Sequence, residues 1–230
     1  MEMALPDGEI LRRGAEAVLV RGSWLGRDAV YKVREIKAYR HPDLDARIRS
    51  ERTASEARII GSLVQAGLPV PCLYDVDLHA ATIVMEYIPG RRLKDVVPTL
   101  ETNVLHAILH RLGETIAAMH GIGLIHGDLT TSNVIIENEA GPGSIEFRVI
   151  DFGLSRHSES IEDRSVDLHL FKRVVTSTHA SAFDDLFPPF MDGYRAWMED
   201  ARKSDQFRQI ETRMRGIEIR GRYVQKKERQ

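Results

Sequence analysis

The chain has 230 residues, of which 43% are hydrophobic, and its formal net charge at pH 7 is −2. This composition suits a globular protein with one or two compact units, and it gives the protein as a whole no electrostatic bias toward nucleic acid. No apolar run reaches the length of a membrane span, and residues 1–9 carry acids where a signal peptide would carry bases. The single Cys72 excludes an internal disulfide, so we expect a cytoplasmic protein.

Residues 1–88 are predicted to form a strand-rich N-lobe. The first candidate site within it is the run Gly14, Ala15, Glu16, Ala17, which stands where a kinase has its Gly-rich phosphate loop. The pattern G-x-G-x-x-G is absent from this run. We therefore expect these four residues to contact ATP phosphates differently from an ordinary Gly-rich loop, or less tightly.

An alternating apolar run, Ala29 to Val33, predicts a strand that carries Lys32, and residues 52–60 predict a helix that carries Glu56. In protein kinases a Lys–Glu ion pair of this kind holds the ammonium group toward the α- and β-phosphates of ATP. We predict that Glu56 is the partner of Lys32, with Glu51 as the fallback. Solvated charges on an amphipathic helix would also explain both acids.

Residues 82–90 predict a buried strand that runs into a hinge. Met85 would flank the adenine ring, and the backbone from Glu86 to Ile88 would hydrogen-bond its edge. A core strand that ends in a Pro-Gly turn explains the same residues without a ligand.

Residues 89–212 are predicted to form a helical C-lobe that contains the strongest motif of the chain. A helical stripe over 102–120 precedes the run His126-Gly127-Asp128-Leu129-Thr130-Thr131-Ser132-Asn133, and Asp151-Phe152-Gly153 follows it. Phosphoryl transfer requires oxygen ligands that bring Mg²⁺ onto a triphosphate from separate backbone segments. We predict that Asn133 and Asp151 bind the metal and that Asp128 orients the attacking hydroxyl or water.

The spacing of these motifs also has a structural explanation. Two short apolar runs, 134–136 and 147–150, predict a hairpin with a turn at Gly141-Pro142-Gly143, and this hairpin would return Asp151 to the side of Asn133. An ordinary hairpin with acidic caps is the alternative. Together with the strand-rich N-lobe, the motifs predict an α+β fold of minimal bilobal protein-kinase type with ATP and Mg²⁺ as cofactors.

Two parts of an ordinary protein kinase are missing. No A-P-E motif follows Asp151, and Asp167 already stands at a predicted helix start near residue 165, so no extended activation segment is expected. Gly127 replaces the Arg that usually lies between the His and the Asp of the catalytic loop. We therefore expect a bound partner to regulate the protein.

A basic tail over residues 213–230 contains seven Lys or Arg and two Glu. Such a segment attracts phosphate backbones, and its glycines are expected to keep it adaptable until a partner orders it. A solvated terminus without a partner is the alternative. The residues predicted to contact RNA or a partner are Arg213, Arg215, Arg220, Arg222, Lys226 and Lys227.

Over nearly its whole length the chain resembles the small atypical kinase/ATPase subunit of the KEOPS (EKC) complex, the PRPK-like family, in its archaeal form. The resemblance is carried by residues 37–45, Arg52-Thr53 with residues 56–58, residues 126–133, 150–155, 166–168, 177–179 and 220–222. It implies ATP hydrolysis or Ser/Thr phosphorylation in support of threonylcarbamoyladenosine modification of tRNA. It also implies that the C-lobe binds the tRNA-threonylcarbamoyltransferase catalytic subunit and the N-lobe a small regulatory subunit. With tRNA as the substrate of such a complex, the charge of the basic tail predicts that the tail contacts tRNA.

Two other functions fit parts of the pattern. Small-molecule phosphotransferases of the aminoglycoside or choline kinase type also use His-Gly-Asp and lack A-P-E, but they need a C-terminal substrate domain for which few residues remain after Asp151. A noncatalytic pseudokinase scaffold is disfavoured because Lys32, Asp128, Asn133 and Asp151 are all present. Production of ADP by the purified chain, measured alone and with tRNA plus the partner complex, would separate these functions.

Overall fold

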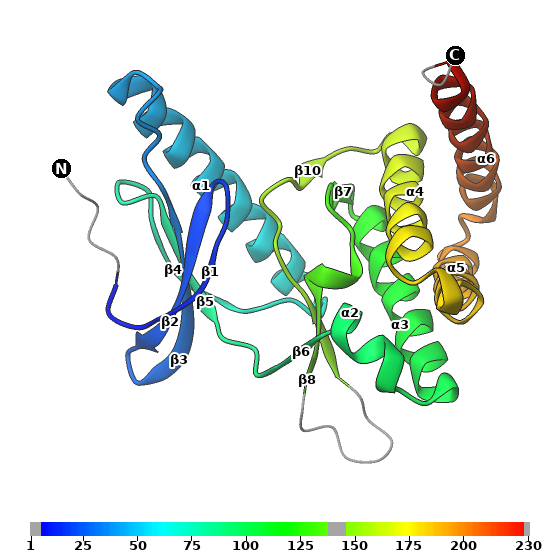
Figure 1. Ribbon diagram of the computed structural model, residues 1–230, viewed down its shortest axis with the longest axis horizontal. Coiled ribbons are helices and arrows are strands. Elements are labelled where there is room, and N and C mark those ends of the chain that lie inside the picture. Colours follow the sequence, from blue (N-terminus) through cyan, green and yellow to red (C-terminus); the bar gives the residue numbers. More distant parts are fainter. Residues whose placement is uncertain (1–5, 138–145, 228–230) are drawn as a thin grey trace. The chain divides into compact units, whose positions relative to one another are not determined.

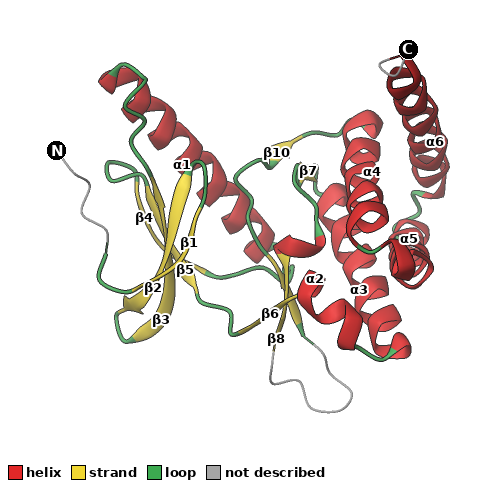
Figure 2. Ribbon diagram, in the orientation of Figure 1, coloured by secondary structure: helices red, strands yellow, loops and turns green. Residues whose placement is uncertain are grey.

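The computed structural model describes residues 6–137 and 146–227. The chain divides into two compact units, Met1–Pro89 and Gly90–Gln230, next to the boundary expected at residue 88. Strands predominate in the first unit and helices in the second (Figures 1 and 2). The α+β fold class predicted from the sequence is therefore confirmed.

The first unit is built on a five-stranded antiparallel sheet with the order β1-β2-β3-β5-β4. Val18 and Val20 alternate with more exposed residues along β2, and the interior strand β5 buries Ile83 and Val84 on both sides of the sheet. The strands are β1 (Glu9–Arg13), β2 (Ala17–Trp24), β3 (Arg27–Arg34), β4 (Leu73–Asp77) and β5 (Thr82–Glu86).

Helix α1 (Pro42–Gln65) contacts β4 and β5 of this sheet. It begins ten residues before the helix predicted at 52–60, because Pro42 fits the first helical turn and Asp43 and Asp45 complement the positive end of the helix dipole. Thr53, Glu56, Ile60 and Leu63 are buried at helical spacing. Glu56 therefore lies on the buried face of α1.

The second unit contains two small sheets. In the first, β6 (Gly90–Arg92), β8 (Val134–Glu137) and β9 (Phe147–Val149) lie in that order. In the second, β7 (Leu124–Ile125) pairs with β10 (Arg156–His157). The β8–β9 pairing confirms the predicted hairpin, although its turn at Gly141-Pro142-Gly143 lies outside the described residues. The short helices are α2 (Leu93–Val96), η1 (Val97–Thr99), η2 (Thr131–Asn133) and η3 (Ala180–Ala182).

Four longer helices complete the second unit: α3 (Thr102–Gly121), α4 (Ile161–Thr178), α5 (Phe183–Asp200) and α6 (Ser204–Lys227). The stripe predicted over 102–120 is the buried face of α3. Helix α4 begins at Ile161 instead of near residue 165, because the Ser160 hydroxyl caps it and accepts hydrogen bonds from the Glu162 and Asp163 N–H groups at 3.1 and 3.4 Å.

Helix α6 corrects the expectation of an adaptable tail. The helix continues through Gly216 and Gly221 to Lys227, so most of the predicted tail segment is helical. Phe207, Ile210 and Met214 are buried at helical spacing along α6, and this apolar stripe packs mainly against α4. Burial of one face thus outweighs the low helix propensity of the two glycines.

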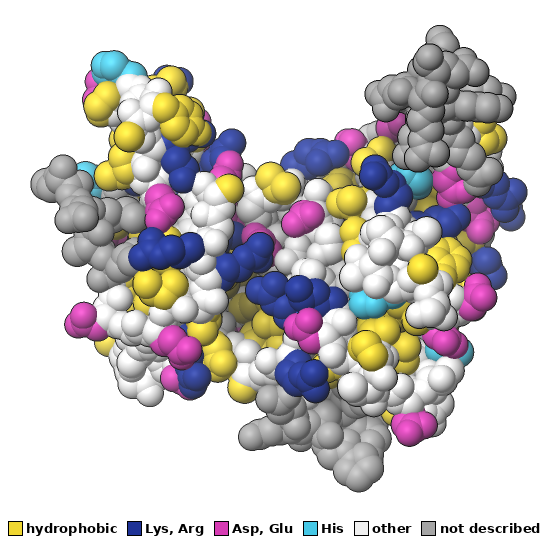
Figure 3. Space-filling model, viewed as in Figure 1, with side chains coloured by type: hydrophobic (Ala, Val, Ile, Leu, Met, Phe, Trp, Pro, Cys, Tyr) yellow, Lys and Arg dark blue, Asp and Glu magenta, His cyan; other side chains and the backbone are white. Residues whose placement is uncertain are grey.

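The visible surface mixes charges of both signs. Lys and Arg side chains are interspersed with Asp and Glu side chains over the face drawn in Figure 3, in keeping with the net charge of −2. Among the helices of residues 6–137 and 146–227, none is both long enough and apolar enough to cross a membrane.

Helices α3 and α5 pack against each other at two glycines. A Cβ atom on Gly113 would lie 1.9 Å from the Phe190 carbonyl oxygen, and one on Gly193 would lie 1.9 Å from the His110 carbonyl oxygen. The backbones of the two helices therefore come into direct contact at these positions. This close approach sets the position of α3, which leads into the segment that carries the catalytic-loop motif.

We predict that Gly113→Ala destabilises the second unit by about 1–3 kcal/mol, because the added methyl group forces two packed backbones apart. The matched control is Gly61→Ala on α1, where an added Cβ meets nothing within 4 Å and where alanine is the better helix former. Urea unfolding of both variants measures the difference. Equal stability of the two variants would contradict the close packing of α3 and α5.

Candidate active site

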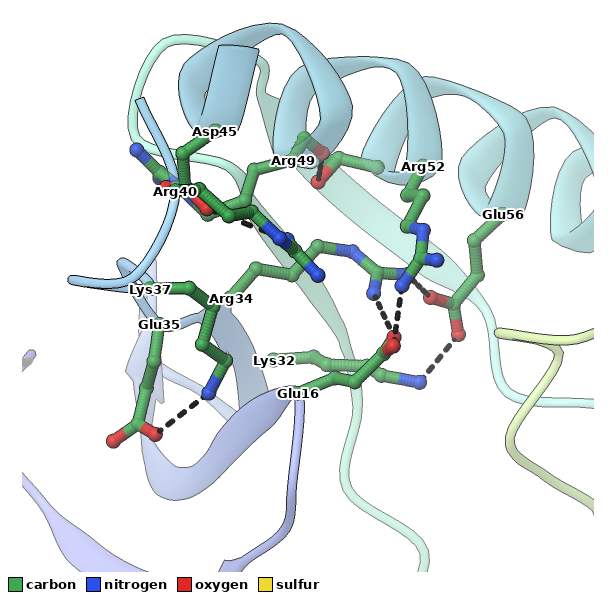
Figure 4. Close-up of polar contacts among 11 residues, drawn as sticks. Glu16, Lys32, Arg34, Glu35, Lys37, Arg40, Asp45, Arg49, Arg52 and Glu56 are labelled. Carbon is green, nitrogen blue, oxygen red and sulfur yellow. Dashed lines mark hydrogen bonds and ion pairs between the residues drawn. The ribbon is translucent and has the colours of Figure 1, made fainter. Parts of the chain in front are cut away.

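Lys32 and Glu56 form the ion pair predicted from the sequence. Lys32 Nζ donates to Glu56 Oε1 at 2.7 Å, and the two side chains are 10% and 2% exposed (Figure 4). The fallback partner, Glu51, is exposed and faces Arg47 at 3.7 Å. The buried position of Glu56 on α1 therefore decides between the two candidates.

Arg34 is a second cation that contacts the Glu56 carboxylate, and it was not among the residues predicted from the sequence. Its Nη2 atom donates to Glu56 Oε2 at 2.6 Å, and its side chain is 4% exposed. Arg34 follows Lys32 by two residues on β3, so the strand period places both side chains on one face, and this signal could have identified it. Loss of one partner from such a buried cluster costs about 3–5 kcal/mol, so Glu56 is firmly held.

The turn from Gly14 to Ala17 is tight, with the Gly14 N–H donating to the Ala17 carbonyl at 2.9 Å. The Glu16 carboxylate pairs with Arg52 of α1 and lies 3.6 Å from Arg34. The hydrogen bond from Arg52 lowers the pKa of Glu16. Glu16 thus ties the β1–β2 turn to α1, and the predicted phosphate contacts of Gly14, Ala15, Glu16 and Ala17 stay predictions.

The hinge residues lie at the end of β5. Glu86 and Cys72 exchange two hydrogen bonds, since the Glu86 N–H donates to the Cys72 carbonyl at 2.9 Å and the Cys72 N–H donates to the Glu86 carboxylate at 3.0 Å. The Glu86 N–H is therefore already engaged, which narrows the predicted adenine contacts to the other backbone groups of this segment. Met85 is half-buried and Ile88 is buried.

Asp128, Asn133 and Asp151 are brought together in the second unit. Asn133 Nδ2 donates to the Asp128 carbonyl at 2.9 Å and to Asp128 Oδ2 at 3.0 Å. The Ile150 N–H donates to the Asn133 carbonyl at 2.9 Å, which places Asp151 directly after a residue bonded to Asn133. This is the juxtaposition that the hairpin was expected to produce.

The donor set fits a magnesium ion. Both acceptors of Asn133 Nδ2 are oxygens, so the amide orientation is fixed and Oδ1 is left as a possible metal ligand. The Asp151 carboxylate supplies the kind of oxygen that Mg²⁺ prefers. No group of three or more His, Cys, Asp or Glu side chains in the described part of the chain could hold a metal alone. A magnesium ion on Asn133 and Asp151 would therefore need further oxygens from phosphate or water.

Asp151 adopts a left-handed backbone conformation, with φ of +67°. This conformation is uncommon for a residue with a side chain, and it persists where surrounding contacts enforce it. The preceding Ile150 is bonded to Asn133, and the following Phe152 is buried with its ring 5.2 Å from that of His126. These contacts fix the backbone on both sides of Asp151.

Asp167 on α4 anchors the catalytic loop, a role that the sequence did not reveal. Its buried carboxylate accepts hydrogen bonds from the His126 N–H at 3.0 Å, the Gly127 N–H at 2.9 Å and His120 Nε2 at 3.2 Å. Burial would raise the pKa of Asp167, but the hydrogen bond and the charge of His120 lower it. Forty-one residues separate His126 from Asp167, so no local pattern indicates this contact.

The His126 ring connects the two carboxylate-bearing segments. Its Nδ1 accepts from the Asp128 N–H at 3.2 Å, which leaves the proton on Nε2, and Nε2 donates to the Ile150 carbonyl at 3.2 Å. Burial lowers the pKa of His126, in keeping with a neutral ring. One imidazole therefore fixes both the backbone of Asp128 and the residue that precedes Asp151.

Gly127 has φ of +81°, and a Cβ atom there would lie 2.3 Å from the Leu154 carbonyl oxygen. The Arg usual in protein kinases is thus excluded at this position by sterics as well as by backbone conformation. The Ser155 hydroxyl donates to the His126 carbonyl at 2.7 Å and holds the chain after Asp151 against the loop.

The segment between Asp151 and α4 is short, as predicted. Helix α4 begins at Ile161. Strand β10 lies between Asp151 and α4, and it pairs with β7. Within the described residues 151–161, this confirms the prediction that Asp151 is followed by only a short segment before the next helix.

Comparison with known proteins identifies relatives over almost the whole chain. Residues 9–186 match the model of the lipopolysaccharide kinase (Kdo/WaaP) family. The chain is 39% identical to the KEOPS complex subunit Bud32 of Pyrococcus abyssi over 221 residues, which cover 94% of this chain and 96% of that protein.

A second relative is longer. The chain is 40% identical over 216 residues to the probable bifunctional tRNA threonylcarbamoyladenosine biosynthesis protein of Methanothermobacter thermautotrophicus, and the match covers 94% of this chain and 37% of that protein. The chain thus spans little more than a third of the length of this relative.

Among solved structures, the chain is similar to the Rio2 kinase–ADP/Mg²⁺-phosphoaspartate complex from Chaetomium thermophilum. The TM-score is 0.55 at 19% sequence identity, and the match covers 89% of this chain and 69% of that chain. At this identity the comparison establishes the protein-kinase-like fold.

We predict that protonation of His126 destabilises the protein at acidic pH. Because burial lowers the pKa of His126 from its ordinary 6.5, the unfolded chain binds this proton more readily than the folded chain. Its contribution to stability is therefore present above about pH 6.5 and is lost as pH falls, by at most about 1.4 kcal/mol per pH unit.

Urea unfolding between pH 7.5 and 5.5, for the wild type and for His126→Gln, measures this contribution. The variant should lose less stability over the window, since the effects of the other histidines cancel in the comparison. An equal loss in both proteins would show that His126 is not held neutral.

Proposed function

The chain belongs to the lipopolysaccharide kinase (Kdo/WaaP) family and to the family of KEOPS complex subunit Bud32, and we propose that it is an ATP-dependent atypical Ser/Thr kinase or ATPase acting as a KEOPS subunit in threonylcarbamoyladenosine modification of tRNA. The observation that carries the proposal is the constellation of Asp128, Asn133 and Asp151, held by Asp167 and His126, in a chain that matches a KEOPS subunit over almost its full length. We place its action in the cytoplasm.

In this proposal each polar residue has one task. Lys32, oriented by Glu56, binds the α- and β-phosphates of ATP, and the residues from Gly14 to Ala17 approach the phosphates through the backbone. Asn133 and Asp151 hold Mg²⁺, which neutralises phosphate charge when bound. Asp128 orients the attacking hydroxyl or water and accepts its proton. Met85 and the Glu86–Ile88 backbone contact adenine.

The proposed partners follow from the relatives. A bifunctional relative joins a segment like this chain to further sequence in one polypeptide, which supports a stable association with a second tRNA threonylcarbamoyladenosine biosynthesis subunit. We assign that catalytic subunit to the second unit and a small regulatory KEOPS subunit to the first. The basic C-terminal residues would contact tRNA, from the helix α6 and not from an adaptable tail.

The family name supports a second candidate, phosphorylation of a small molecule or glycan. After α4, however, the described second unit contains only η3, α5 and α6, which leaves little for a substrate domain of the aminoglycoside or choline kinase type. ATP turnover that depends on added tRNA and partner subunits would favour the KEOPS proposal. Turnover that depends on an added sugar or amino alcohol would favour the second.

We predict different losses from the two catalytic carboxylates. Asp151→Ala should weaken Mg²⁺–ATP binding and abolish turnover, because metal ligation contributes to the ground state and the transition state alike. Asp128→Ala should lower turnover by about 100-fold or more but keep most of the nucleotide affinity, because it acts chiefly in the transition state. ADP production and equilibrium titration with a nonhydrolysable ATP analogue measure the two quantities.

Asp75→Ala is the matched control, since Asp75 is an exposed acid on β4 outside the site. It should leave both quantities unchanged. Equal loss of nucleotide affinity in the Asp151 and Asp128 variants would refute the division of roles.

We also predict that the basic end of α6 contributes to RNA binding. Because the segment is helical, substitution is a cleaner test than deletion, and glutamine preserves the helix. The test variant replaces Arg220, Arg222, Lys226 and Lys227. In the assembled complex, the slope of log affinity against log salt should become shallower by about 0.7–0.9 for each phosphate that the variant no longer neutralises.

The control carries four Gln substitutions at exposed arginines of the first unit, which change the net charge equally: Arg12, Arg27, Arg47 and Arg58. Its salt dependence should match the wild type. The same slope in the test variant, at matched assembly, would mean that this end of α6 does not contact RNA.

A further inference from the structure

A cavity of about 160 Å³ lies in the first unit, between the β1–β2 turn, the end of β3 and the N-terminal half of α1. Ala15 and Glu16 line it from the turn, and Ile48 lines it from α1. Its remaining wall is strongly basic. The cations that line it are Arg34, Lys37, Arg40, Arg49 and Arg52.

The carboxylates around this cavity are too few to neutralise it. Asp45 is 2.7 Å from Arg49 and 3.4 Å from Arg40, Glu56 is shared by Lys32 and Arg34, and Glu16 is shared by Arg34 and Arg52. Glu35 adds a weaker contact to Lys37 at 3.8 Å. Figure 4 shows these groups, which come from the β1–β2 turn, from β3, from the segment between β3 and α1, and from α1. The cluster has six cations and four carboxylates, a net charge of +2.

Most of these charges are held in place and only partly solvated, whereas the Arg52 and Glu16 side chains are 44% and 48% exposed. The side chains of Arg34, Arg49, Lys37 and Arg40 are 4%, 13%, 20% and 22% exposed. The surrounding cations also lower the pKa of Glu16, chiefly through the hydrogen bond from Arg52. In such a partly dehydrated hollow, uncompensated positive charge attracts an anion strongly.

We propose that this basic cavity binds a single phosphate dianion, as orthophosphate or as a phosphate monoester. The charge matches, since a phosphate monoester carries about −1.5 to −2 near neutral pH, whereas each phosphate of an RNA backbone carries a single negative charge. The size matches as well, because the cavity has room for one tetrahedral group and not for a run of nucleotides. Arginine forks supply the bidentate hydrogen bonds that phosphate oxygens accept.

An anion in this cavity would compete with Glu16 for Arg52. The Glu16–Arg52 pair ties the β1–β2 turn to α1, so a bound phosphate would release this turn. Ala15 and Glu16, which belong to the run assigned above to the ATP phosphates, line the cavity, but Lys32 and Glu56 do not. The proposed ligand is therefore a phosphate held by the arginines of the cavity, separate from the α- and β-phosphates assigned to Lys32. The inference does not depend on the proposed function.

The test is calorimetric titration of the full chain with orthophosphate at constant ionic strength. Arg52→Gln and Arg40→Gln should each weaken binding by about tenfold or more, because each removes a charged hydrogen-bond donor. Glu16→Gln should tighten binding, because it removes the competing carboxylate. Arg47→Gln is the matched control, since Arg47 lies on the same helix, is 70% exposed and does not line the cavity.

Circular dichroism melting of each variant confirms that it is folded. If the Arg52 and Arg40 variants both weaken phosphate binding, a local folding defect in one of them does not explain the loss of affinity. O-Phosphoserine should bind with the same dependence on the variants if the source is a monoester. Absence of saturable binding to the wild type, or equal affinity in all variants, would overturn the proposal. Variant-dependent binding of a short single-stranded RNA without binding of orthophosphate would overturn it too, and would identify the cavity as a phosphodiester contact.

Discussion

The buried carboxylate of Asp167 is the constraint on which the candidate site of the second unit depends. It accepts two backbone N–H groups of the catalytic loop and one imidazole N–H, so a charge removed from water is matched by three donors. The loop that it holds carries Asp128, and the His126 ring extends the same constraint to Ile150 and thus to Asp151. The positions of two catalytic candidates therefore derive from a residue that would itself touch neither metal nor substrate.

Close backbone contacts also hold the catalytic loop and Asp151, and they restrict the backbone conformations of these segments. Gly127 is left-handed and lies against Leu154, while Asp151 takes a left-handed conformation despite its side chain. Such conformations persist where many contacts enforce them, and they are typical of functional sites. In the first unit a comparable role falls to Glu56, whose two oxygens hold Lys32 and Arg34. The described contacts position Asp128, Asp151 and Lys32 without an extended activation segment.

The sequence predicted those parts of the structure that have a local signal. The order of the motifs, the hairpin between Asn133 and Asp151, the α3 stripe and the Lys32–Glu56 pair were all readable, because periodicity and spacing determine them. Arg34 also has a local signal, because the two-residue period of a strand places it on the same face as Lys32. The start of α1 at Pro42 was missed because it depends on a proline and two acids in the first helical turn. The continuation of α6 to Lys227 was missed because burial of one face outweighed local propensity. The anchoring role of Asp167 and the contact of Glu16 with Arg52 join residues far apart in sequence, and only the fold brings them together.

We propose that Asn133 and Asp151 hold the metal of a bound nucleotide. Manganese in place of magnesium, added with a nonhydrolysable ATP analogue, broadens NMR signals of nearby nuclei and so locates the metal directly. We expect the backbone amide signals of Asn133 and Asp151 to disappear first, and only when the nucleotide is present. Persistence of both signals while those of another region disappear would contradict it.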